Sequence, residues 1–467
     1  MKNRILNRHL VVYTTFRKIK MNTLQTTETL HETTVPIRVG HTNDSSISLD
    51  RLKEMCTEAG VDDVGFVEID RAGLEEERDG ALEAFPRAKT FISFVCRVNR
   101  ENMRTPMRSV SNLEFHHAAD KVNEVGRKLV AMLEREGIGA INPAHGFPME
   151  ADRWPGRMWV VSHKLIAQEA GMGVMGIHRL VIHPKFGNHI LLGTVIMEAQ
   201  VEDHAQPIDF NPCLECKLCV AACPTGAVKS NGDFDFAACY THNYREFMGG
   251  FGDWVEGVAS SKSVKDYRSK YTDSETTSMW QSLGWGPNYK AAYCMSVCPA
   301  GDDVIGPFLE NKKQFVADVL KPLQQKEEVV YVIDGSDAQQ HVAKRFRNKQ
   351  ARVVGSGLRP RDAKSFYRAL PWLFQRDQSD GLDCVYHFTI IDKAKESHKA
   401  TITIREKALD VQDGLHGKPT IRLVASEAAW IGFVRKERTL VRGLVTRGIK
   451  IKGNPKLMLK FGQCFPS

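Results

Sequence analysis

Cys213-Leu-Glu-Cys216-Lys-Leu-Cys219-Val-Ala-Ala-Cys223-Pro224 is the stretch that decides the fold of this chain. Its cysteines have the C-x2-C-x2-C-x3-C-P spacing that wraps a tight loop around an iron–sulfur cluster. In that arrangement the first three thiolates hold one cluster and the fourth belongs to a second, so a partner motif is expected downstream. Cys294-Met-Ser-Val-Cys298-Pro299 repeats the C-x3-C-P half, and Cys239 lies between the two motifs. The spacing therefore predicts a protein that handles electrons.

A zinc site is the main alternative for such cysteines. Structural zinc sites favour paired C-x2-C knuckles and have no need of two C-x3-C-P endings. Disulfides are disfavoured, because a chain of 467 residues without a secretory signal should keep its thiols reduced. The other cysteines are interpreted as small apolar packing residues: Cys56, Cys96, Cys384 and Cys464.

The charge of the chain is unevenly distributed. The net charge is +8, yet the residues from His341 onward hold 26 Lys and Arg against 11 Asp and Glu, which leaves the part before His341 with an excess of seven acids. Such asymmetry indicates separate domains. Because the positive charges are scattered, we expect a solvated face, no nucleic-acid partner, and at most peripheral membrane contact.

The start of the chain has the composition of a targeting segment. Residues 1–34 contain six Lys and Arg but no acid before Glu28, which is typical of an organelle transit peptide. An over-long gene start, with Met21 as the true first residue, is the other interpretation. No apolar run approaches the roughly 20 residues that span a bilayer, so we expect a cytoplasmic protein, or a mitochondrial one if the segment is a transit peptide.

Composition and periodicity divide the chain into five parts. The expected parts are a disordered or targeting segment at 1–45, an α/β domain at 46–205, a two-cluster ferredoxin-like module with an insertion at 206–312, a linker at 313–328 and a last domain at 329–467. Helices are expected at 49–59, 112–136, 426–445 and 455–461. Strands are expected at 64–69, 90–95, 138–141, 190–197, 385–391, 400–405, 408–411 and 449–453. The insertion at 240–293 has weak periodicity and is interpreted as a lid or a substrate wall.

Two further stretches accompany the cysteine motifs: Val161-Ser-His-Lys-Leu-Ile-Ala-Gln-Glu-Ala-Gly-Met-Gly-Val-Met-Gly176 and His183-Pro-Lys-Phe-Gly-Asn-His-Ile-Leu-Leu-Gly-Thr194. With them the chain, over roughly Leu49 to Pro307, resembles the cobalamin-dependent epoxyqueuosine reductases and reductive dehalogenases. The tail, from Trp430-Ile-Gly-Phe433 through Lys450-Ile-Lys-Gly-Asn-Pro455 to Phe461-Gly462, resembles a sterol-carrier-protein-2-type domain.

The resemblance implies a nitroreductase-like α/β domain that holds cobalamin, a two-cluster bacterial-ferredoxin-like module, and an α+β sterol-carrier-like domain. Two [4Fe–4S] clusters would feed electrons to cobalt. The implied ligands of the first cluster are Cys213, Cys216, Cys219 and Cys298, and those of the second are Cys223, Cys239 and Cys294. The implied cobalamin-binding residues are His116, Gly171, Gly173, Gly176, His183 and Gly187.

The chain departs from the family pattern at two places. Related reductases have another cysteine three residues before Cys294, where this chain has Ala291. The second cluster is therefore either incomplete, with three irons, or takes Cys96, Cys56, His242 or water as its fourth ligand. The epoxyqueuosine reductases also use an aspartate where an ungapped comparison puts Arg157, which disfavours the queuosine reaction.

Reduction of a carbon–heteroatom bond needs an acid close to the substrate. Dehalogenases use a tyrosine with a basic partner, and the cation is expected from Arg153, Arg157 or Lys164, which would stabilise a departing halide. Phe115 occupies the aromatic position ahead of His116 and cannot donate a proton. The candidate proton donors are Tyr240, Tyr244, His116 and His163.

The sequence therefore predicts an oxidoreductase that cleaves a carbon–halogen or related bond of an apolar small molecule. An external donor such as a ferredoxin or flavodoxin would supply the electrons. Two alternatives stay open: a two-cluster electron carrier without corrinoid, and a lipid-binding protein with a redox module. The tail itself is either a collector of apolar substrate or a folding and dimerisation module.

Overall fold

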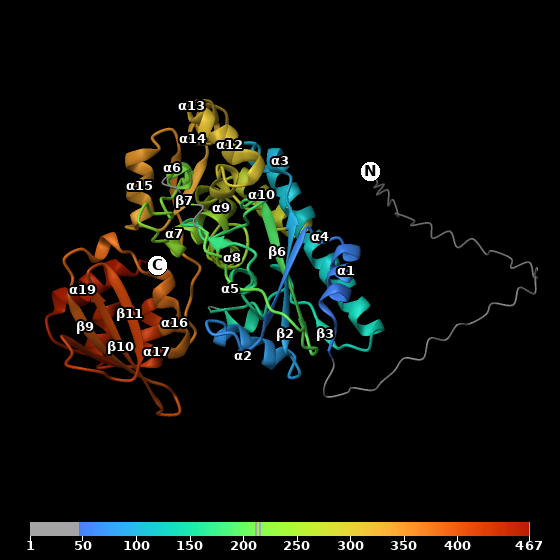
Figure 1. Ribbon diagram of the computed structural model, residues 1–467. Helices are drawn as coiled ribbons and strands as arrows, with labels where there is room; N and C mark the ends of the chain where they lie inside the picture. The colour runs from blue at the N-terminus through green and yellow to red at the C-terminus, as the bar shows by residue number, and fades with distance from the viewer. Residues whose placement is uncertain (1–45, 155, 211–212, 214–215, 467) are drawn as a thin grey trace, which may run out of the picture. The chain divides into compact units, whose positions relative to one another are not determined.

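The first part of the described chain is an antiparallel sheet with helices on both faces (Figure 1). The computed structural model describes residues 46–154, 156–210, 213 and 216–466, so the expected targeting segment at 1–45 lies outside the described residues. The strand order is β1-β2-β6-β3. These strands are β1 (Asp63–Glu68), β2 (Thr90–Arg97), β3 (Ala140–Ile141) and β6 (Ile190–Met197). The surrounding elements are α1 (Leu49–Ala59), α2 (Glu75–Ala84), α3 (Arg100–Arg104), α4 (Arg108–Arg135), α5 (His163–Glu169), the 3-10 turn η1 (Ala151–Arg153) and the small hairpin β4 (Val174–Met175) and β5 (Val181–Ile182).

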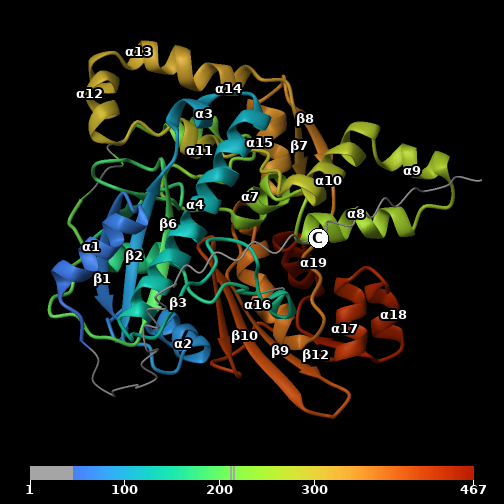
Figure 2. The same ribbon diagram turned by 90° about the vertical axis from the view of Figure 1, so that its right-hand side faces the viewer.

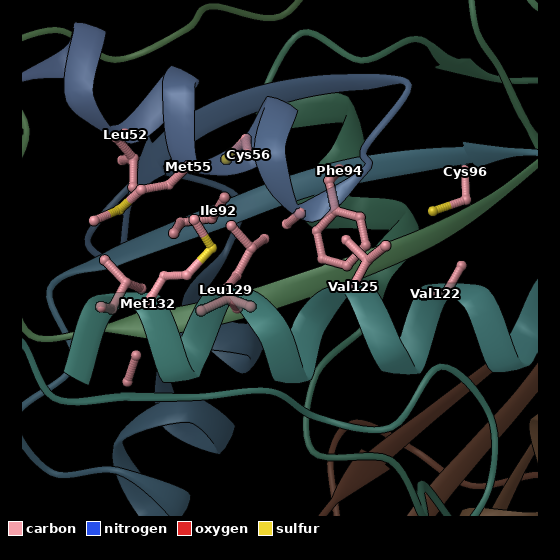
Figure 3. Packing of buried hydrophobic residues seen from close by; sticks show 14 of the residues in the cluster. Leu52, Met55, Cys56, Ile92, Phe94, Cys96, Val122, Val125, Leu129 and Met132 are labelled. Carbon is pink, nitrogen blue, oxygen red and sulfur yellow. The ribbon is translucent and has the colours of Figure 1, made fainter. Parts of the chain in front are cut away.

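Helix α1 shows how the local sequence produces this packing. The Ser48 hydroxyl accepts the N–H of Arg51 at its start, and Gly60 ends it with φ of 97°, a left-handed conformation that glycine adopts without a Cβ penalty. Its buried side chains recur at helical spacing and face α4 and β2 (Figure 3). Cys56 and Cys96 lie in this core, both fully buried. The expected helix at 49–59 and strand at 190–197 are confirmed.

The second part carries the cysteine motifs on short helices. These helices are α6 (Leu218–Ala222), α7 (Phe236–Asn243) and α11 (Tyr293–Ser296). The expected insertion between them, which showed weak periodicity, is also helical, as α8 (Gly249–Ala259), α9 (Val264–Lys270) and α10 (Asp273–Trp285). Across the described residues, no helix combines the length and the apolar character that crossing a bilayer would require.

The expected linker at 313–328 is mostly helical. It contains most of α13 (Lys312–Phe315), the π-helical turn η2 (Val316–Leu320) and α14 (Lys321–Gln325), and α12 (Asp302–Glu310) precedes it. Val319, Leu320 and Leu323 are buried in the same apolar cluster as Cys219 and Tyr293. This burial makes the segment a support of the cysteine-bearing helices rather than a spacer.

A two-stranded parallel unit precedes the C-terminal domain. It consists of β7 (Val329–Val332), α15 (Asp337–Arg345) and β8 (Gln350–Val353). The apolar side chains of β7 and α15 pack against Ala227, Ala238 and Cys239. The sequence reasoning placed this unit inside the last domain, because its strands are only four residues long.

The last part is a five-stranded sheet in the order β11-β10-β9-β12-β13 (Figure 2). The strands are β9 (Cys384–Ile391), β10 (Ser397–Arg405), β11 (Ala408–Asp413), β12 (Ile421–Ser426) and β13 (Ile449–Lys452). The helical elements are α16 (Ala363–Leu373), the 3-10 turn η3 (Asp377–Ser379), α17 (Glu427–Val434), α18 (Leu440–Val445) and α19 (Pro455–Cys464). The expected single helix at 426–445 is two helices, because a turn at 435–439 interrupts it.

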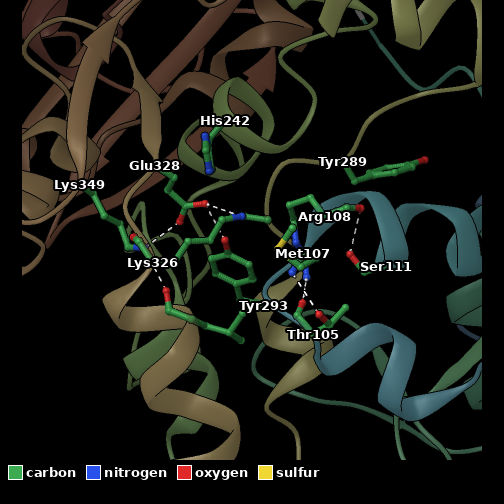
Figure 4. Close-up of polar contacts among 12 residues, drawn as sticks. Thr105, Met107, Arg108, Ser111, His242, Tyr289, Tyr293, Lys326, Glu328 and Lys349 are labelled. Carbon is green, nitrogen blue, oxygen red and sulfur yellow. Dashed lines mark hydrogen bonds and ion pairs between the residues drawn. The ribbon is translucent and has the colours of Figure 1, made fainter. Parts of the chain in front are cut away.

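A buried ionic network ties the segment before Cys294 to the β7–β8 unit (Figure 4). The Tyr293 hydroxyl donates to Glu328 at 2.6 Å, and the Lys349 ammonium donates to the other Glu328 oxygen at 2.8 Å. Lys326 lies 3.3 Å from the same carboxylate, and Arg108 lies over the Tyr293 ring. Burial alone would raise the pKa of Glu328, but the bonds from Lys349 and Tyr293 outweigh it and the pKa is lowered. Glu328 is therefore an ionised carboxylate that several groups share.

We predict that Glu328→Gln destabilises the chain by about 3 kcal/mol, because it leaves the fully buried Lys349 cation without its counter-charge. The adjacent Glu327 is exposed, so Glu327→Gln is the matched control and should change the free energy of unfolding by less than about 0.5 kcal/mol. Anaerobic urea unfolding followed by tryptophan fluorescence measures both. Equal effects of the two substitutions would contradict a structural role for the network.

Stability should also fall in mild acid because of buried histidines. His189 is 2% exposed, and burial, with Arg100 and Arg104 nearby, lowers its pKa from 6.5 to about 3. Between pH 6.5 and about pH 3 the unfolded chain binds a proton at His189 and the folded chain does not. The stability that neutral His189 contributes is therefore present above pH 6.5 and is lost as the pH falls. We predict that His189→Gln reduces the slope of unfolding free energy against pH by about 1 kcal/mol per pH unit between pH 6.5 and 5. The exposed His117, changed to Gln, should leave the slope unchanged, and an unchanged slope in His189→Gln would refute the assignment.

Candidate functional site

Four cysteines line one cavity. Cys213 and Cys216 come from the loop before α6, Cys219 from α6, and Cys298 from the segment after α11. Lys217 has φ of 49°, which turns the loop between Cys216 and Cys219. The cavity is otherwise lined by Ile177, His178, Ile182, Lys217, Leu218 and Pro299. The structure thus brings together the ligands expected for the first cluster, which we call the first thiol set.

The other three motif cysteines form a second thiol set: Cys223, Cys239 and Cys294. Burial, and then the charges of Cys223 and Cys294, raise the pKa of Cys239 well above its usual value. Besides burial, the charge of Cys294 raises the pKa of Cys219 and of Cys298, which belong to the first set. The two sets therefore adjoin, as electron transfer between two centres requires.

The spacing of the sulfurs differs from that of a single metal ion. Tetrahedral zinc with Zn–S bonds of 2.3 Å holds its sulfurs about 3.8 Å apart. Among the described residues, no three cysteine sulfurs lie within 4.8 Å of one another, and the group that meets this limit is Asp392, Glu396 and His398. A cubane cluster binds its cysteines at separate corners and so needs a wider spacing. The described sulfurs therefore do not form a ready-made zinc site.

Cys294 and Cys298 need a metal centre to ionise in this interior. Burial, followed by neighbouring thiols, raises the pKa of Cys294 and of Cys298 to about 12. Each thiolate would be formed in a low-dielectric interior and beside other thiolates, which is costly unless a metal neutralises the charge. The residues present therefore fit iron–sulfur clusters chemically.

The side chains expected as a fourth ligand of the second set lie in different surroundings. Ala291 is in the loop before α11, where its N–H donates to Asn243 Oδ1 at 2.9 Å. The adjacent His242 accepts the Tyr331 N–H at Nδ1, and its buried Nε2 has no hydrogen-bond partner among the described residues. Besides burial, the charges that shift the pKa of His242 include those of Glu328 and its lysine partners. Cys56 and Cys96 lie in the core between α1, α4 and β2.

Lys164 is the expected cation that lies beside the second thiol set. Enclosure by protein lowers the pKa of Lys164, while the charges of Cys294 and Cys239, which lie close to it, raise it. The Lys164 ammonium donates to the carbonyl of Arg179 at 2.8 Å. The side chain is accessible to solvent. Lys164 is therefore a solvent-accessible cation close to the second thiol set.

A series of neighbouring aromatic side chains includes Tyr244, which lies near the same thiols, and we call this series the aromatic wall: Phe115, His145, Tyr244, Phe247 and Tyr289. Burial, and then the charge of Cys239, raise the pKa of Tyr244 well above its usual value. Burial raises the pKa of Tyr289 to about 12. Both tyrosines are half-buried, and within the described chain neither hydroxyl has a hydrogen-bond partner. Each phenol thus keeps its proton at neutral pH and can direct it to a ligand.

The other expected catalytic residues lie in packed surroundings. Arg157 pairs with Glu77, whose side chain is 2% exposed, and Arg153 pairs with Glu83 at 2.6 Å, so both arginines are held by α2. His163 bonds Thr194 and the Ala144 carbonyl, and burial lowers its pKa to about 4. The Tyr240 hydroxyl accepts the Gly249 N–H, and its ring stacks on Trp154. Tyr240 and His163 nevertheless border the aromatic wall, because Tyr240 packs against Tyr244 and His163 stacks on His145.

The residues expected to bind cobalamin have structural partners. A Cβ on the Gly171, Gly173 or Gly187 residues would approach a backbone oxygen within 2.7 Å, and one on Gly176 would meet the His178 ring. His183 pairs with Asp63 at 3.0 Å. His116 bonds the Pro287 carbonyl at 2.7 Å and lies near Tyr289. Their role toward a corrinoid stays a prediction, and close packing explains the glycines without one.

The sequence patterns did not identify Tyr289 and His145 as members of the aromatic wall. Tyr289 lies in the Gly286-Pro287-Asn288-Tyr289 turn, five residues before Cys294. That short distance from a cluster ligand was the available signal. His145 has no such signal, since α4 and β6 bring it to the wall only in the folded chain.

Comparisons with known proteins agree with both resemblances. Residues 373–466 match the SCP-2 sterol transfer family. An epoxyqueuosine reductase of Prochlorococcus marinus is 24% identical over 269 residues, which are 50% of this chain and 83% of the relative. The chain spans only about 20% to 34% of the length of several other epoxyqueuosine reductases that it matches.

Two solved structures show the same pair of relatives at lower identity. An epoxyqueuosine reductase with a tRNA stem loop is 16% identical, with a TM-score of 0.34, over 70% of this chain and 85% of its own. The reductive dehalogenase NpRdhA with 3-bromo-4-hydroxybenzoic acid is 16% identical, with a TM-score of 0.37, over 65% of this chain and 39% of its own.

The tRNA complex overturns one expectation. Nucleic acid was excluded as a partner because the positive charges of the chain are scattered. A protein similar to this chain is seen with a tRNA stem loop, so that exclusion is wrong.

The relatives are named reductases, which supports an oxidoreductase. The chain is thus similar to the epoxyqueuosine reductases and reductive dehalogenases in its first part and ends in a region that matches the SCP-2 sterol transfer family.

Proposed function

We propose that this chain is a reductase that uses two iron–sulfur clusters and a corrinoid to cleave a carbon–heteroatom bond. The observation that carries the proposal is that two adjoining thiol sets lie beside Lys164, a cation accessible to solvent, and Tyr244 of the aromatic wall. We propose the carbon–halogen bond of an apolar organic molecule as the first substrate class.

The reaction requires two electrons and one proton: the carbon–halogen bond breaks, a carbon–hydrogen bond forms, and halide leaves. A bound corrinoid supplies a cobalt centre for two-electron reduction at carbon. The aromatic wall offers flat apolar faces that hold such a substrate and exclude water. Lys164 places a cation where halide departs, and Tyr244 or Tyr289 holds the proton that carbon receives.

The queuosine reaction is the second candidate, because a similar protein is seen with an epoxyqueuosine-modified tRNA stem loop. One feature of this chain disfavours it. Arg157 stands near the place of the aspartate that epoxyqueuosine reductases use, and it is held in an ion pair with Glu77. A modified stem loop is therefore the second substrate to assay.

The cofactor content tests the first half of the proposal. After anaerobic reconstitution with iron, sulfide and cobalamin, we expect about seven or eight irons and one cobalt per chain. Cys239→Ala should lose about half of the iron, because it removes a ligand of the second set. Cys384→Ala, a buried cysteine in the C-terminal sheet, is the matched control and should keep all of it. Full iron without cobalt would identify an electron carrier instead, and tightly bound zinc would refute the clusters.

The chemistry is tested by replacing the proposed proton donors. With titanium(III) citrate as reductant and a brominated phenol as substrate, Tyr244→Phe with Tyr289→Phe should lower turnover by at least about a hundredfold. Tyr267 bonds Thr276 within the insertion, so Tyr267→Phe should leave turnover unchanged. Iron and cobalt content should be equal in all variants. Undiminished turnover in the double variant would rule out both tyrosines as acids.

A further inference from the structure

Helix α18 in the C-terminal domain presents apolar side chains to solvent on one face. Val441 is 69% exposed, Leu444 41% and Val445 77%. Val441 lies three and four residues before the other two, so the three share one helix face. The opposite side faces inward: Gly443 is buried, and a Cβ there would lie 2.6 Å from Ile449. The exposed face is thus fixed outward by packing against β13.

Unpaired arginines surround this face. Residues 435–460 contain nine Lys and Arg and one acid, Glu437. That acid pairs with Arg435 at 3.5 Å. Within the part of the chain that the structure describes, Arg438, Arg442 and Arg447 are exposed and have no acid within ion-pair distance.

Helix α18 contacts both β13 and α17, and Figure 2 draws it beside α17. It packs against Ile449, on the face of the sheet where the β12 and β13 side chains are buried. Arg422 and Lys452 lie opposite each other in the register, are exposed, and alternate with those buried side chains. They therefore lie on the other face of the sheet, and the positive charge beside the α18 face comes from Arg438, Arg442 and Arg447.

From these observations we propose that the α18 face docks on an anionic lipid bilayer. The arginines would lie at the headgroups while Val441, Leu444 and Val445 enter the interface, as in amphipathic helices that lie on membranes. A nucleic acid would satisfy the arginines but would leave the two valines in water. The apolar tips therefore favour the bilayer over a polyanion. The proposal is independent of the reductase chemistry.

The test is co-sedimentation of the full chain with extruded vesicles. We expect binding to vesicles of phosphatidylcholine with 30% phosphatidylglycerol, no binding to phosphatidylcholine alone, and release at 0.5 M salt. Arg442→Gln with Arg447→Gln should weaken binding more than tenfold, at about fivefold for each arginine. Val441→Ser with Val445→Ser should also weaken it more than tenfold at unchanged charge.

Matched controls use equally exposed residues elsewhere. Val264 on α9 is 66% exposed, so Val264→Ser should bind like the unmodified chain. Far-ultraviolet circular dichroism verifies that each variant is folded. Failure to bind the anionic vesicles, equal binding to neutral ones, or binding that the serine pair leaves intact would overturn the proposal. If the serine pair leaves binding intact and the same face binds an RNA oligonucleotide, the partner is a polyanion rather than a bilayer.

Discussion

Seven cysteine thiols from three separate segments have to meet in the interior of this protein, and the rest of the structure depends on that convergence. Helices α6, α7 and α11 are short elements that cannot hold their positions by helix propensity alone. Packing from η2 and α14, and the shared Glu328 carboxylate beside Tyr293, fix them instead. Cys219 and Cys239 have raised pKa values in this setting, so the convergence is costly until metal centres neutralise the thiolate charges.

The same convergence brings titratable groups close to the second thiol set. Lys164, which is accessible to solvent, and Tyr244 lie near Cys239 and Cys294, and the Tyr289 ring contacts Tyr244. Within the described residues neither phenol has a hydrogen-bond partner. In the proposed reduction the protein has to provide a proton, a cation near the leaving group and apolar faces. The partly buried pair Arg157–Glu77 and the exposed pair Arg153–Glu83 belong to the packing of α2.

The sequence predicted those features that depend on spacing within one segment. The grouping of Cys213, Cys216, Cys219 and Cys298, and of Cys223, Cys239 and Cys294, followed from motif spacing and the family resemblance, and the structure places them together. Strand β6 and helix α1 followed from apolar periodicity. The β7–β8 unit could not be predicted, because strands of four residues are too short to show periodicity. The ion-pair partner of Arg157 could not be predicted either, because Glu77 lies 80 positions away in the sequence and no local pattern links the two residues.

Gly171, Gly173 and Gly187 show what a family resemblance can and cannot predict. The resemblance implied that they bind cobalamin, and the structure sets their backbones against the Gln206, Ile182 and Ala300 carbonyl oxygens. Close packing explains these glycines by itself, and a role toward cobalamin stays a prediction.

Iron K-edge X-ray absorption of the anaerobically reconstituted full chain tests whether the seven thiols hold two multi-iron centres. We expect sulfur in the first shell and a strong iron–iron signal. At equal protein concentration, Cys239→Ala should give about half of the iron absorption. Iron with sulfur but no iron–iron signal, or zinc in its place, would show that the thiols hold single metal ions instead.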